Sequence, residues 1–454
     1  MRSIPQGQMT LKSPVLIAAL ACAILFGAAG PVSAKTYTLE QCLKLAKLNR
    51  ESIQRAEGQE RNDAAEVRRQ FGRLFLPSIS GSYNTSETRL REREQNFFDP
   101  TAGMRVDATL PDVDLTGASF SLSAGLMLFD GLSNVHDYLG VRKLRKSSQL
   151  NVLRTEQNLE LEVKTAYLAY LANLRNLSVQ EEAVRRSQEQ LNLVQSRYDV
   201  GSASLSDVLK QKVRFGNDNL SLLEADNAVQ TRAADLAFVV GLNPSDDNSF
   251  DTTYAEDVYS GTIESAIQTG LSNHPDLRAA RLDVSTMNHF LKSSYGDYLP
   301  SLSANVSRSW SDNTSPDPSG QPFTSSSTST RLGISVRWNI FDQLNRESRV
   351  VGRKVAHNNA RAAEFELRNK IVKNVKTNYL DVQKATEQVK VSKETVVSAS
   401  EDMNLAQEKY NLGSASILDL LDAQVSLKEA QVSLIRSKLD LNLAVAKLEN
   451  AMGS

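Results

Sequence analysis

The sequence predicts a mixed α/β protein that contains two tandem copies of one structural unit. Three observations support this prediction. The stretch GSASLSDVL from Gly201 returns as GSASILDLL from Gly413. Ahead of each stretch, apolar residues recur every seven residues, which is typical of a coiled-coil helix. Still farther toward the N-terminus, apolar and polar residues alternate, which is typical of β-strands with two different faces.

The composition limits the classes of partner. The chain has 454 residues, of which 41% are hydrophobic and 23% charged, so it can build large cores or several domains. Its 52 Lys and Arg residues are balanced by 53 Asp and Glu residues. Because nucleic-acid binding needs a basic surplus, this balance predicts no nucleic-acid partner, although a local basic patch stays open.

The N-terminus predicts a secretory signal. Residues 15–29 form an apolar run, and residues 32–34 supply the cleavage positions before Lys35. The run is roughly half as long as a membrane-spanning helix, so residues 1–34 are predicted to be a cleaved signal peptide. Cys22 raises the alternative of a lipoprotein signal, but it lies inside the apolar run. After cleavage Cys42 would remain alone, which excludes an intramolecular disulfide.

A fixed spacing relates the two copies. An offset of 212 residues connects Tyr198 with Tyr410 and Asp207 with Asp419. Farther toward the N-terminus the offset becomes 223, where LPS from Leu76 matches LPS from Leu299. Such repetition predicts one unit built twice. The first repeat is expected over 35–241, with a helix, a β-hairpin at 77–130 and a helical hairpin with its tip near 198–207. A linker is expected over 242–261. The second repeat is expected over 262–454, with a helix, a β-hairpin at 300–342 and a helical hairpin with its tip near 410–419.

Long helices are expected in both copies, starting near Leu132 and Leu344. A strict seven-residue repeat keeps one apolar stripe against a partner helix, and helices of this length reach on the order of 100 Å. The two series are Val163, Tyr170, Leu177, Val184, Leu191 and Tyr198, and Val375, Val382, Val389, Val396, Met403 and Tyr410.

The repeated nine residues are predicted to end one helix and start the next. Gly201 and Gly413 suit the left-handed conformation at a helix C-terminus. Ser204 with Asp207, and Ser416 with Asp419, are spaced as capping boxes. The returning helices then carry an apolar stripe that we expect to face the outgoing arm, formed by Leu209, Val213, Leu220 and Leu223 and by Leu421, Val425, Val432 and Ile435.

The alternating segments predict strands of about ten residues with one apolar face and one face of Ser, Asn, Gly and Arg. Residues 87–115 and 311–330 are expected to be exposed loops between them. The strands could form half-buried hairpins on a soluble core. Their small, mostly uncharged polar face and their length instead favour a membrane-spanning sheet around a water-filled lumen.

A sheet in lipid cannot leave an edge unpaired, and four strands per chain cannot close a barrel. The barrel would therefore be shared between chains. Two chains would give eight strands and a filled interior, whereas three would give twelve strands and room for an aqueous path. The full prediction is a mixed α/β membrane protein, in which a conduit favours the trimer.

The sequence resembles the TolC-type outer-membrane efflux proteins over essentially the whole mature chain. The resemblance rests on the tandem duplication, on the LPS and FD motifs beside the strands, and on EKYNLGSASILDLLDAQVSLKEAQ from Glu408. It implies a homotrimer with a twelve-stranded barrel in outer-membrane lipid and a long α-helical barrel across the periplasm. It also implies a periplasmic adaptor and an inner-membrane pump of the RND, ABC or MFS type, in tripartite efflux or type I secretion.

The resemblance also implies roles for tip residues. Asp419 and Asp422 match aspartates that form a periplasmic gate, with Asp207 as the first-repeat counterpart of Asp419. Helix capping, or simple exposure for Asp422, is the alternative. Ala415 stands where some members have a latch arginine, which leaves such a latch without support. The residues expected at the tips, for adaptor docking, are Tyr198, Gly201, Ser204, Tyr410, Gly413 and Ser416.

The sequence predicts no enzyme, metal or cofactor. Its four histidines show no metal-ligand spacing, and no glycine-rich phosphate-binding motif is present. The predicted function is therefore that of a passive exit duct for substrates delivered by the pump. The alternative is a periplasmic coiled-coil adaptor or spacer without a pore, and the sequence does not separate small-molecule cargo from polypeptide cargo.

Overall fold

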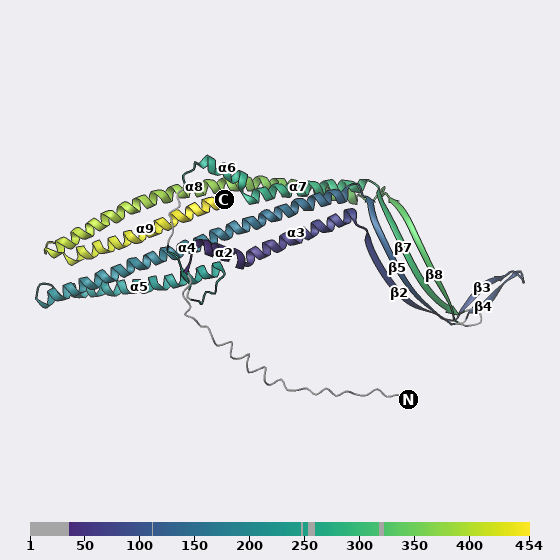
Figure 1. Ribbon diagram of the computed structural model, residues 1–454, viewed down its shortest axis with the longest axis horizontal. Helices are drawn as coiled ribbons and strands as arrows, with labels where there is room; N and C mark the ends of the chain where they lie inside the picture. The colour runs from purple at the N-terminus through teal and green to yellow at the C-terminus, as the bar shows by residue number, and fades with distance from the viewer. Residues whose placement is uncertain (1–35, 111, 247, 253–258, 317–321) are drawn as a thin grey trace, which may run out of the picture. The chain divides into compact units, whose positions relative to one another are not determined.

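The computed structural model describes residues 36–110, 112–246, 248–252, 259–316 and 322–454 (Figure 1). The predicted signal peptide and Cys22 lie outside these residues. The chain divides into two compact units, and each unit takes segments from both sequence repeats. Of the described residues, we call those within 50–162, 259–404 and 436–454 the sheet unit, and those within 36–49, 163–252 and 405–435 the tip unit. Three of the boundaries fall inside helices, namely α4 (Ser133–Asp199), α8 (Asn345–Asn411) and α9 (Ile417–Met452).

The sheet unit contains one antiparallel four-stranded sheet in the order β2-β5-β7-β8 (Figure 1). Its strands are β2 (Ser78–Leu90), β5 (Val113–Phe129), β7 (Ser301–Pro316) and β8 (Pro322–Arg337). They have 13 to 17 residues, so the expected length of about ten was too short. The Ser- and Thr-rich segment over 311–330 was expected to be a loop, but its described residues continue the pairing of β7 with β8. Its hydroxyls bond across the two strands, as Ser311 does with Ser327.

The prediction of a loop over residues 87–115 was also wrong. Between β2 and β5 the chain forms a second hairpin of β3 (Arg93–Asp99) and β4 (Met104–Leu110). Gly103 adopts a φ of 65°, which suits a tight turn between strands. The charged residues suggested a loop, but charged residues do not prevent strand pairing.

The two hairpins of the sheet have the same register. Ser78 pairs with Gly125 in the first hairpin, and Ser301 pairs with Arg337 in the second. The offset of 223 relates Ser78 to Ser301, and the offset of 212 relates Gly125 to Arg337. The serine pairs follow the same rule, since Ser80 bonds to Ser123 and Ser303 bonds to Ser335, both at 2.8 Å. The sequence repeat is therefore a structural repeat down to individual cross-strand pairs.

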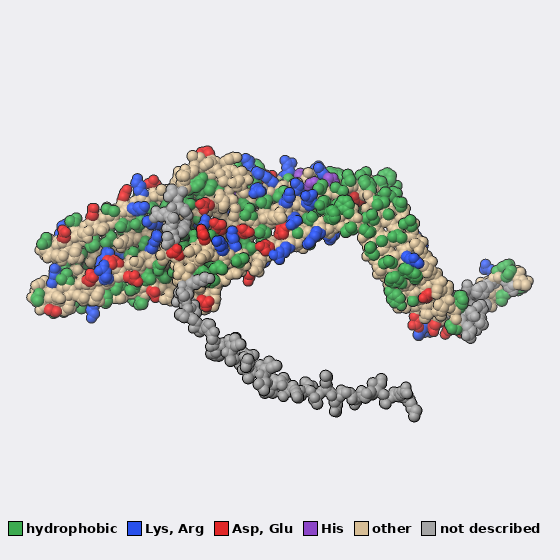
Figure 2. Space-filling model, in the orientation of Figure 1, with side chains coloured by type: hydrophobic (Ala, Val, Ile, Leu, Met, Phe, Trp, Pro, Cys, Tyr) green, Lys and Arg blue, Asp and Glu red, His purple; other side chains and the backbone are tan. Residues whose placement is uncertain are grey.

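The other face of the sheet is apolar and exposed. Hydrophobic side chains gather over the strands in Figure 2. They include Ile79, Tyr83, Phe120, Leu122, Leu332, Ile334 and Val336, which range from 44% to 81% exposed. A soluble surface rarely carries so large an apolar patch, so this face requires a cover or an apolar solvent.

Helices fill the rest of the sheet unit. Its segments include α3 (Glu51–Phe75), α6 (Ile263–Asn273), α7 (Pro275–Tyr295) and a short 3₁₀ turn, η1 (Gly296–Tyr298). A core of mostly aliphatic residues joins α6 and α7 to parts of α8 and α9, with Leu277, Val375 and Leu448 fully buried. Among the described helices, none combines the length and the hydropathy of a transmembrane span.

The tip unit contains the ends of two helical hairpins (Figure 1). In the first, α4 is followed by α5 (Leu205–Val240); in the second, α8 is followed by α9. A helix α2 (Leu39–Asn49) and a two-residue parallel pair of β1 (Thr36–Tyr37) and β6 (Ser249–Phe250) complete the unit. Burial centres on Val163, Tyr167 and Leu236, and the Tyr167 hydroxyl donates to the carbonyl of Asp251 at 2.6 Å.

The expectation that Leu209, Val213, Leu220 and Leu223 face the outgoing arm was wrong. These side chains are exposed, and α5 instead buries Gln211, Asp218 and Ala225, which are spaced by seven residues. The buried face of α5 is therefore partly polar, so a prediction based on hydrophobic residues alone selected a different face. In the second hairpin, the corresponding Leu421, Val425, Val432 and Ile435 are half-buried.

Candidate functional site: the two hairpin tips

Both tips turn through a left-handed glycine. Gly201 has a φ of 74° and Gly413 a φ of 75°. The amide after each glycine bonds back into the preceding helix: Ser202 donates to the carbonyl of Arg197 at 2.7 Å, and Ser414 donates to that of Lys409 at 2.8 Å. These bonds satisfy carbonyls that a helix end would otherwise leave unpaired. The predicted glycine turns are confirmed.

A capping box then starts each returning helix. The Asp207 amide donates to the Ser204 hydroxyl oxygen at 3.2 Å, while the Asp207 carboxylate accepts from the Ser204 amide at 3.2 Å. Ser416 and Asp419 repeat the arrangement, with distances of 3.3 Å and 2.9 Å. The capping role of these aspartates is therefore confirmed, and their role as a gate stays a prediction.

The three candidate gate carboxylates differ in their surroundings. Asp207 is half-buried, whereas Asp419 and Asp422 are exposed. Hydrogen bonds from the backbone and the hydroxyl of Ser416 lower the pKa of the Asp419 carboxyl. Capping therefore keeps Asp419 ionised, and an ionised cap can still present its charge to solvent. Asp422 lies one turn farther along α9 and could add a second charge beside it.

An arginine that the sequence reading missed bridges the two tips. The Arg197 guanidinium lies 5.0 Å from the ring centroid of Tyr410, and it donates to the Asn411 side chain at 3.3 Å. Ala415, the position compared with a latch arginine, offers no such group. Arg197 comes instead from the first hairpin, and its counterpart at the 212-residue offset is Lys409. A basic residue at the end of both outgoing helices was the signal available in the sequence.

A buried ion cluster also ties the hairpins together. Asp218 on α5 is 1% exposed, and its carboxylate lies 2.9 Å from the Lys428 ammonium of α9 and 3.0 Å from Arg214 Nε. Burying a carboxylate is costly unless cations beside it compensate its lost hydration, and Arg214 and Lys428 supply those cations. At the 212-residue offset Asp218 corresponds to Ala430, so the second hairpin has no counterpart of this carboxylate.

The outermost side chains of the tips are apolar. Val200 and Leu412 immediately precede the turn glycines, and they are 77% and 83% exposed. The remaining predicted tip residues surround them: Tyr198 is exposed, Tyr410 is half-buried, and Ser204 and Ser416 are capping residues. Val200 and Leu412 occupy the same place in both copies, which the sequence repeat could have indicated.

Two titratable side chains outside the tips, His289 and Cys42, have shifted pKa values. His136 and His289, which the sequence left apart, approach to 3.4 Å between their Nδ1 atoms, and burial together with His136 lowers the pKa of His289. Burial raises the pKa of the Cys42 thiol to about 11, which makes it unreactive. Within the described ranges, no group of three or more His, Cys, Asp or Glu side chains could hold a metal ion.

Comparison with solved structures agrees with this architecture. The chain resembles the outer membrane protein VceC of Vibrio cholerae with a TM-score of 0.72 at 15% identity, covering 92% of this chain and 96% of that one. It resembles the CmeC outer membrane channel of Campylobacter jejuni with a TM-score of 0.74 at 15% identity, covering 100% and 94%. These identities show a shared fold.

Sequence comparison points the same way. The outer membrane efflux protein BepC of Brucella suis is 22% identical over 379 residues, which cover 84% of this chain and 77% of BepC. TolC of Vibrio cholerae is 24% identical, covering 76% of this chain and 83% of TolC. The profile of the family described as outer membrane efflux protein matches residues 42–242 and 266–454. The chain therefore belongs to the outer membrane efflux protein family.

Proposed function

We propose that three copies of this chain form a passive exit duct in the outer membrane, which receives substrates from an inner-membrane pump through a periplasmic adaptor. The observation that carries the proposal is the sheet with an exposed apolar face, in which β2 and β8 each pair with one neighbour and leave their outer edges unpaired within the described chain. In lipid the apolar face needs no protein cover, but both edges must be paired. Pairing each edge with another copy meets that need.

The internal register predicts how copies would pair. The junction of β5 with β7, where Ser123 pairs with Ser307, joins the second strand of repeat one to the first strand of repeat two. The offset of 212 relates Ser123 to Ser335, and the offset of 223 relates Ser307 to Asn84. We therefore expect Ser335 of one chain to pair with Asn84 of the partner subunit. Equal junctions within and between chains would close a regular barrel. Twelve strands would leave an aqueous lumen, whereas eight would fill it with side chains.

The exposed stripe of α5 supports assembly in the tip unit. Leu209, Val213, Leu220 and Leu223 are 54% to 67% exposed along one helix face. Burial of apolar surface stabilises association by about 25 cal/mol per Å². A second copy packed on this stripe would remove the largest apolar surface of α5 from water.

Disulfide cross-linking tests the register and the number of chains. Asn84→Cys combined with Ser335→Cys is expected to give, after oxidation, a covalent species of three chains as the largest band on a denaturing gel. Thr85→Cys combined with Ser335→Cys is the matched control, because Thr85 faces the opposite side of the sheet. A largest species of two chains, or equal cross-linking of the control, would contradict the trimeric barrel.

At the tips we propose two separate roles. Asp419, Asp422 and Asp207 would place carboxylates around the periplasmic entrance, where they attract cations and oppose anions. Val200 and Leu412, with Tyr198, Tyr410 and the turn of Gly201 and Gly413, would form the contact for the adaptor. The pump could be of the RND, ABC or MFS type, and the cargo small molecules or polypeptides.

Single-channel conductance and export in cells test the duct and separate these roles. Asp419→Asn/Asp422→Asn, which keeps an acceptor for the cap, is expected to reduce cation selectivity by several-fold in a planar bilayer. Val200→Asn/Leu412→Asn, which adds no charge, is expected to leave conductance unchanged but to cause retention of an exported dye in intact cells. Asp402→Asn and Ser202→Asn/Ser414→Asn are the matched controls. Folded trimers without any conductance would favour the alternative of a periplasmic spacer.

A further inference from the structure

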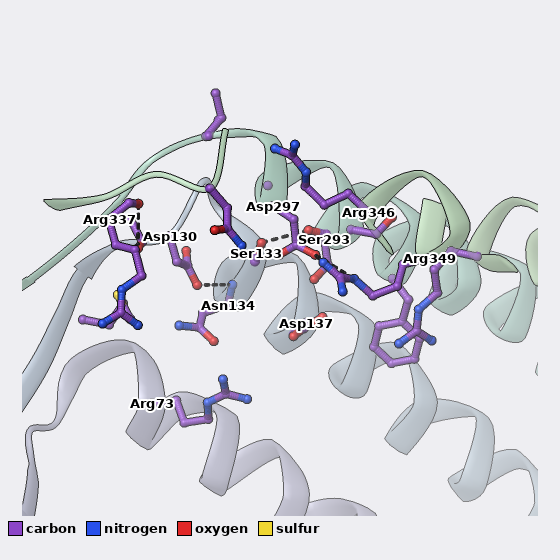
Figure 3. A pocket seen from close by; sticks show the side chains of 18 residues that line it. Arg73, Asp130, Ser133, Asn134, Asp137, Ser293, Asp297, Arg337, Arg346 and Arg349 are labelled. Carbon is purple, nitrogen blue, oxygen red and sulfur yellow. Dashed lines mark hydrogen bonds and ion pairs between the residues drawn. The ribbon is translucent and has the colours of Figure 1, made fainter. Parts of the chain in front are cut away.

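A cavity rich in arginine lies where the strands of the sheet unit meet its helices. It has a volume of 460 Å³, and parts of α3, α4, α7, α8 and the adjoining strands line it. Figure 3 shows Arg73 from α3 and Arg337 from the end of β8 on either side of Asn134. Five arginines line the cavity, against three aspartates. They are Arg73, Arg337, Arg346, Arg349 and Arg353.

The wall of the cavity is a closely packed backbone. Gly131 and Gly296 approach so closely that a Cβ on Gly131 would lie 2.7 Å from the Cα of Gly296. The Ser133 hydroxyl donates to the carbonyl of Ser293 at 2.8 Å and joins α4 to α7 (Figure 3). These contacts fix the relative positions of α4 and the end of α7 on this side of the cavity.

The carboxylates near the cavity are largely occupied. Asp130 accepts from the amide of Asn134 at 2.8 Å, and Asp342 accepts from the amide of Arg346 at 3.1 Å, so each caps a helix. Asp297 lies 2.9 Å from the guanidinium of Arg349. These contacts explain the FD motifs, because Asp130 and Asp342 are the aspartates of the two copies. Of the three aspartates that line the cavity, these contacts leave Asp137 as an acceptor for the other arginines.

Three arginines then remain for a ligand. Within the described part of the chain, Arg73, Arg337 and Arg353 have no carboxylate within 4.0 Å. Arg353 is held over the ring of Phe290 at 5.5 Å, and Arg73 donates to the Gln70 side chain at 3.4 Å. A guanidinium offers a planar pair of donors that matches a phosphate group. Because clustered guanidinium groups repel one another, binding of such an anion between them would stabilise the folded protein.

A second cavity extends from the first. It has a volume of 580 Å³ and shares Arg73, Met127 and Asn134 with the arginine cavity. Its lining adds apolar groups from Leu76, Pro77, Leu126 and Ala304. Together the two spaces offer cationic and apolar surfaces side by side, which suits an amphiphile with a phosphate headgroup.

We propose that the arginine cavity binds a phosphate group, supplied either by a phospholipid headgroup or by a soluble phosphate-bearing anion. Arg73 and Arg337, which lie near Asn134 in Figure 3, would donate to its oxygens, and Arg353 would add positive charge to the lining. The neighbouring apolar space favours the lipid, because it could receive the part of the lipid next to the headgroup. The proposed duct does not depend on phosphate binding, so this site can fail while the duct stands.

Titration of two probes tests the site. The purified full-length protein in non-ionic detergent is titrated with phosphatidylglycerol, followed by native mass spectrometry, and with inorganic phosphate, followed by phosphorus NMR. Arg73→Gln/Arg337→Gln/Arg353→Gln is expected to weaken binding at least tenfold, and Arg337→Gln alone about threefold. Arg278→Gln/Arg361→Gln/Arg368→Gln removes the same charge from exposed helix positions and is expected to bind as the unmodified protein does.

The outcomes separate the two sources. Saturable binding of phosphatidylglycerol that only the cavity variants lose supports a lipid site. Binding of inorganic phosphate with the same pattern, and no lipid binding, supports a soluble anion. Equal binding by the cavity variants and the control variant, or no binding of either probe by the unmodified protein, overturns the proposal. Arg337→Gln replaces an exposed strand-end residue, so it keeps the test informative if the triple variant fails to fold.

Discussion

Replacing Gly131 by glutamine is expected to destabilise the junction between β5 and α4 by about 3 kcal/mol or more. Two effects add. Gly131 has a φ of 71°, which a residue with a side chain adopts only at a cost. A Cβ at this position would also overlap the backbone of Gly296, which cannot move without separating α4 from the end of α7. The yield of folded protein and the midpoint of thermal unfolding measure the effect.

The second repeat provides a matched control. Gln343 is the counterpart of Gly131 at the 212-residue offset, and it has a φ of 60°. Glutamine is thus tolerated in the same backbone conformation where no such close approach occurs. Gln343→Gly is expected to change the free energy of unfolding by only about 1 kcal/mol or less. If Gly131→Gln were equally mild, the close approach to Gly296 would not limit this junction.

The repeat explains why much of this fold could be predicted. The two offsets place Ser78 with Gly125, and Ser301 with Arg337, and both pairs occur in the sheet. Helix starts expected near Leu132 and Leu344 lie close to the observed ones at Ser133 and Asn345. The glycine turns and capping boxes were predictable because they depend on neighbouring residues alone.

Contacts between distant residues were not predictable in this way. Arg197 meets Tyr410, and Asp218 meets Lys428, across more than 200 residues of sequence. Periodicity also selected the wrong face of α5, because its buried positions Gln211 and Asp218 are polar. The partners of these polar groups lie on other helices, since Gln211 donates to the carbonyl of Ser187 on α4 and Asp218 contacts Lys428 on α9, so the sequence of α5 alone does not indicate them.

The second large effect is expected at Asp218. Asp218→Ala gives the first hairpin the residue that the second hairpin has at Ala430, and it leaves Arg214 and Lys428 without their shared counter-charge. Removing one partner from a buried ion pair costs about 3 to 5 kcal/mol, because the remaining charge stays poorly hydrated. We therefore expect a lower midpoint of thermal unfolding. If this cluster holds the two hairpins together in a closed entrance, single-channel conductance should also rise.

A triple variant separates charge from packing. Asp218→Ala/Arg214→Met/Lys428→Met removes all three charged groups of the cluster and keeps apolar side chains of similar length on α5 and α9. If uncompensated charge causes the loss, this variant should be clearly more stable than Asp218→Ala alone. Its conductance should nevertheless stay high, because methionine cannot replace the ionic contact between the hairpins. Equal unfolding midpoints for the two variants would assign the effect to a packing defect at position 218. An unchanged conductance in both variants would show that Asp218 stabilises the tips without holding the entrance closed.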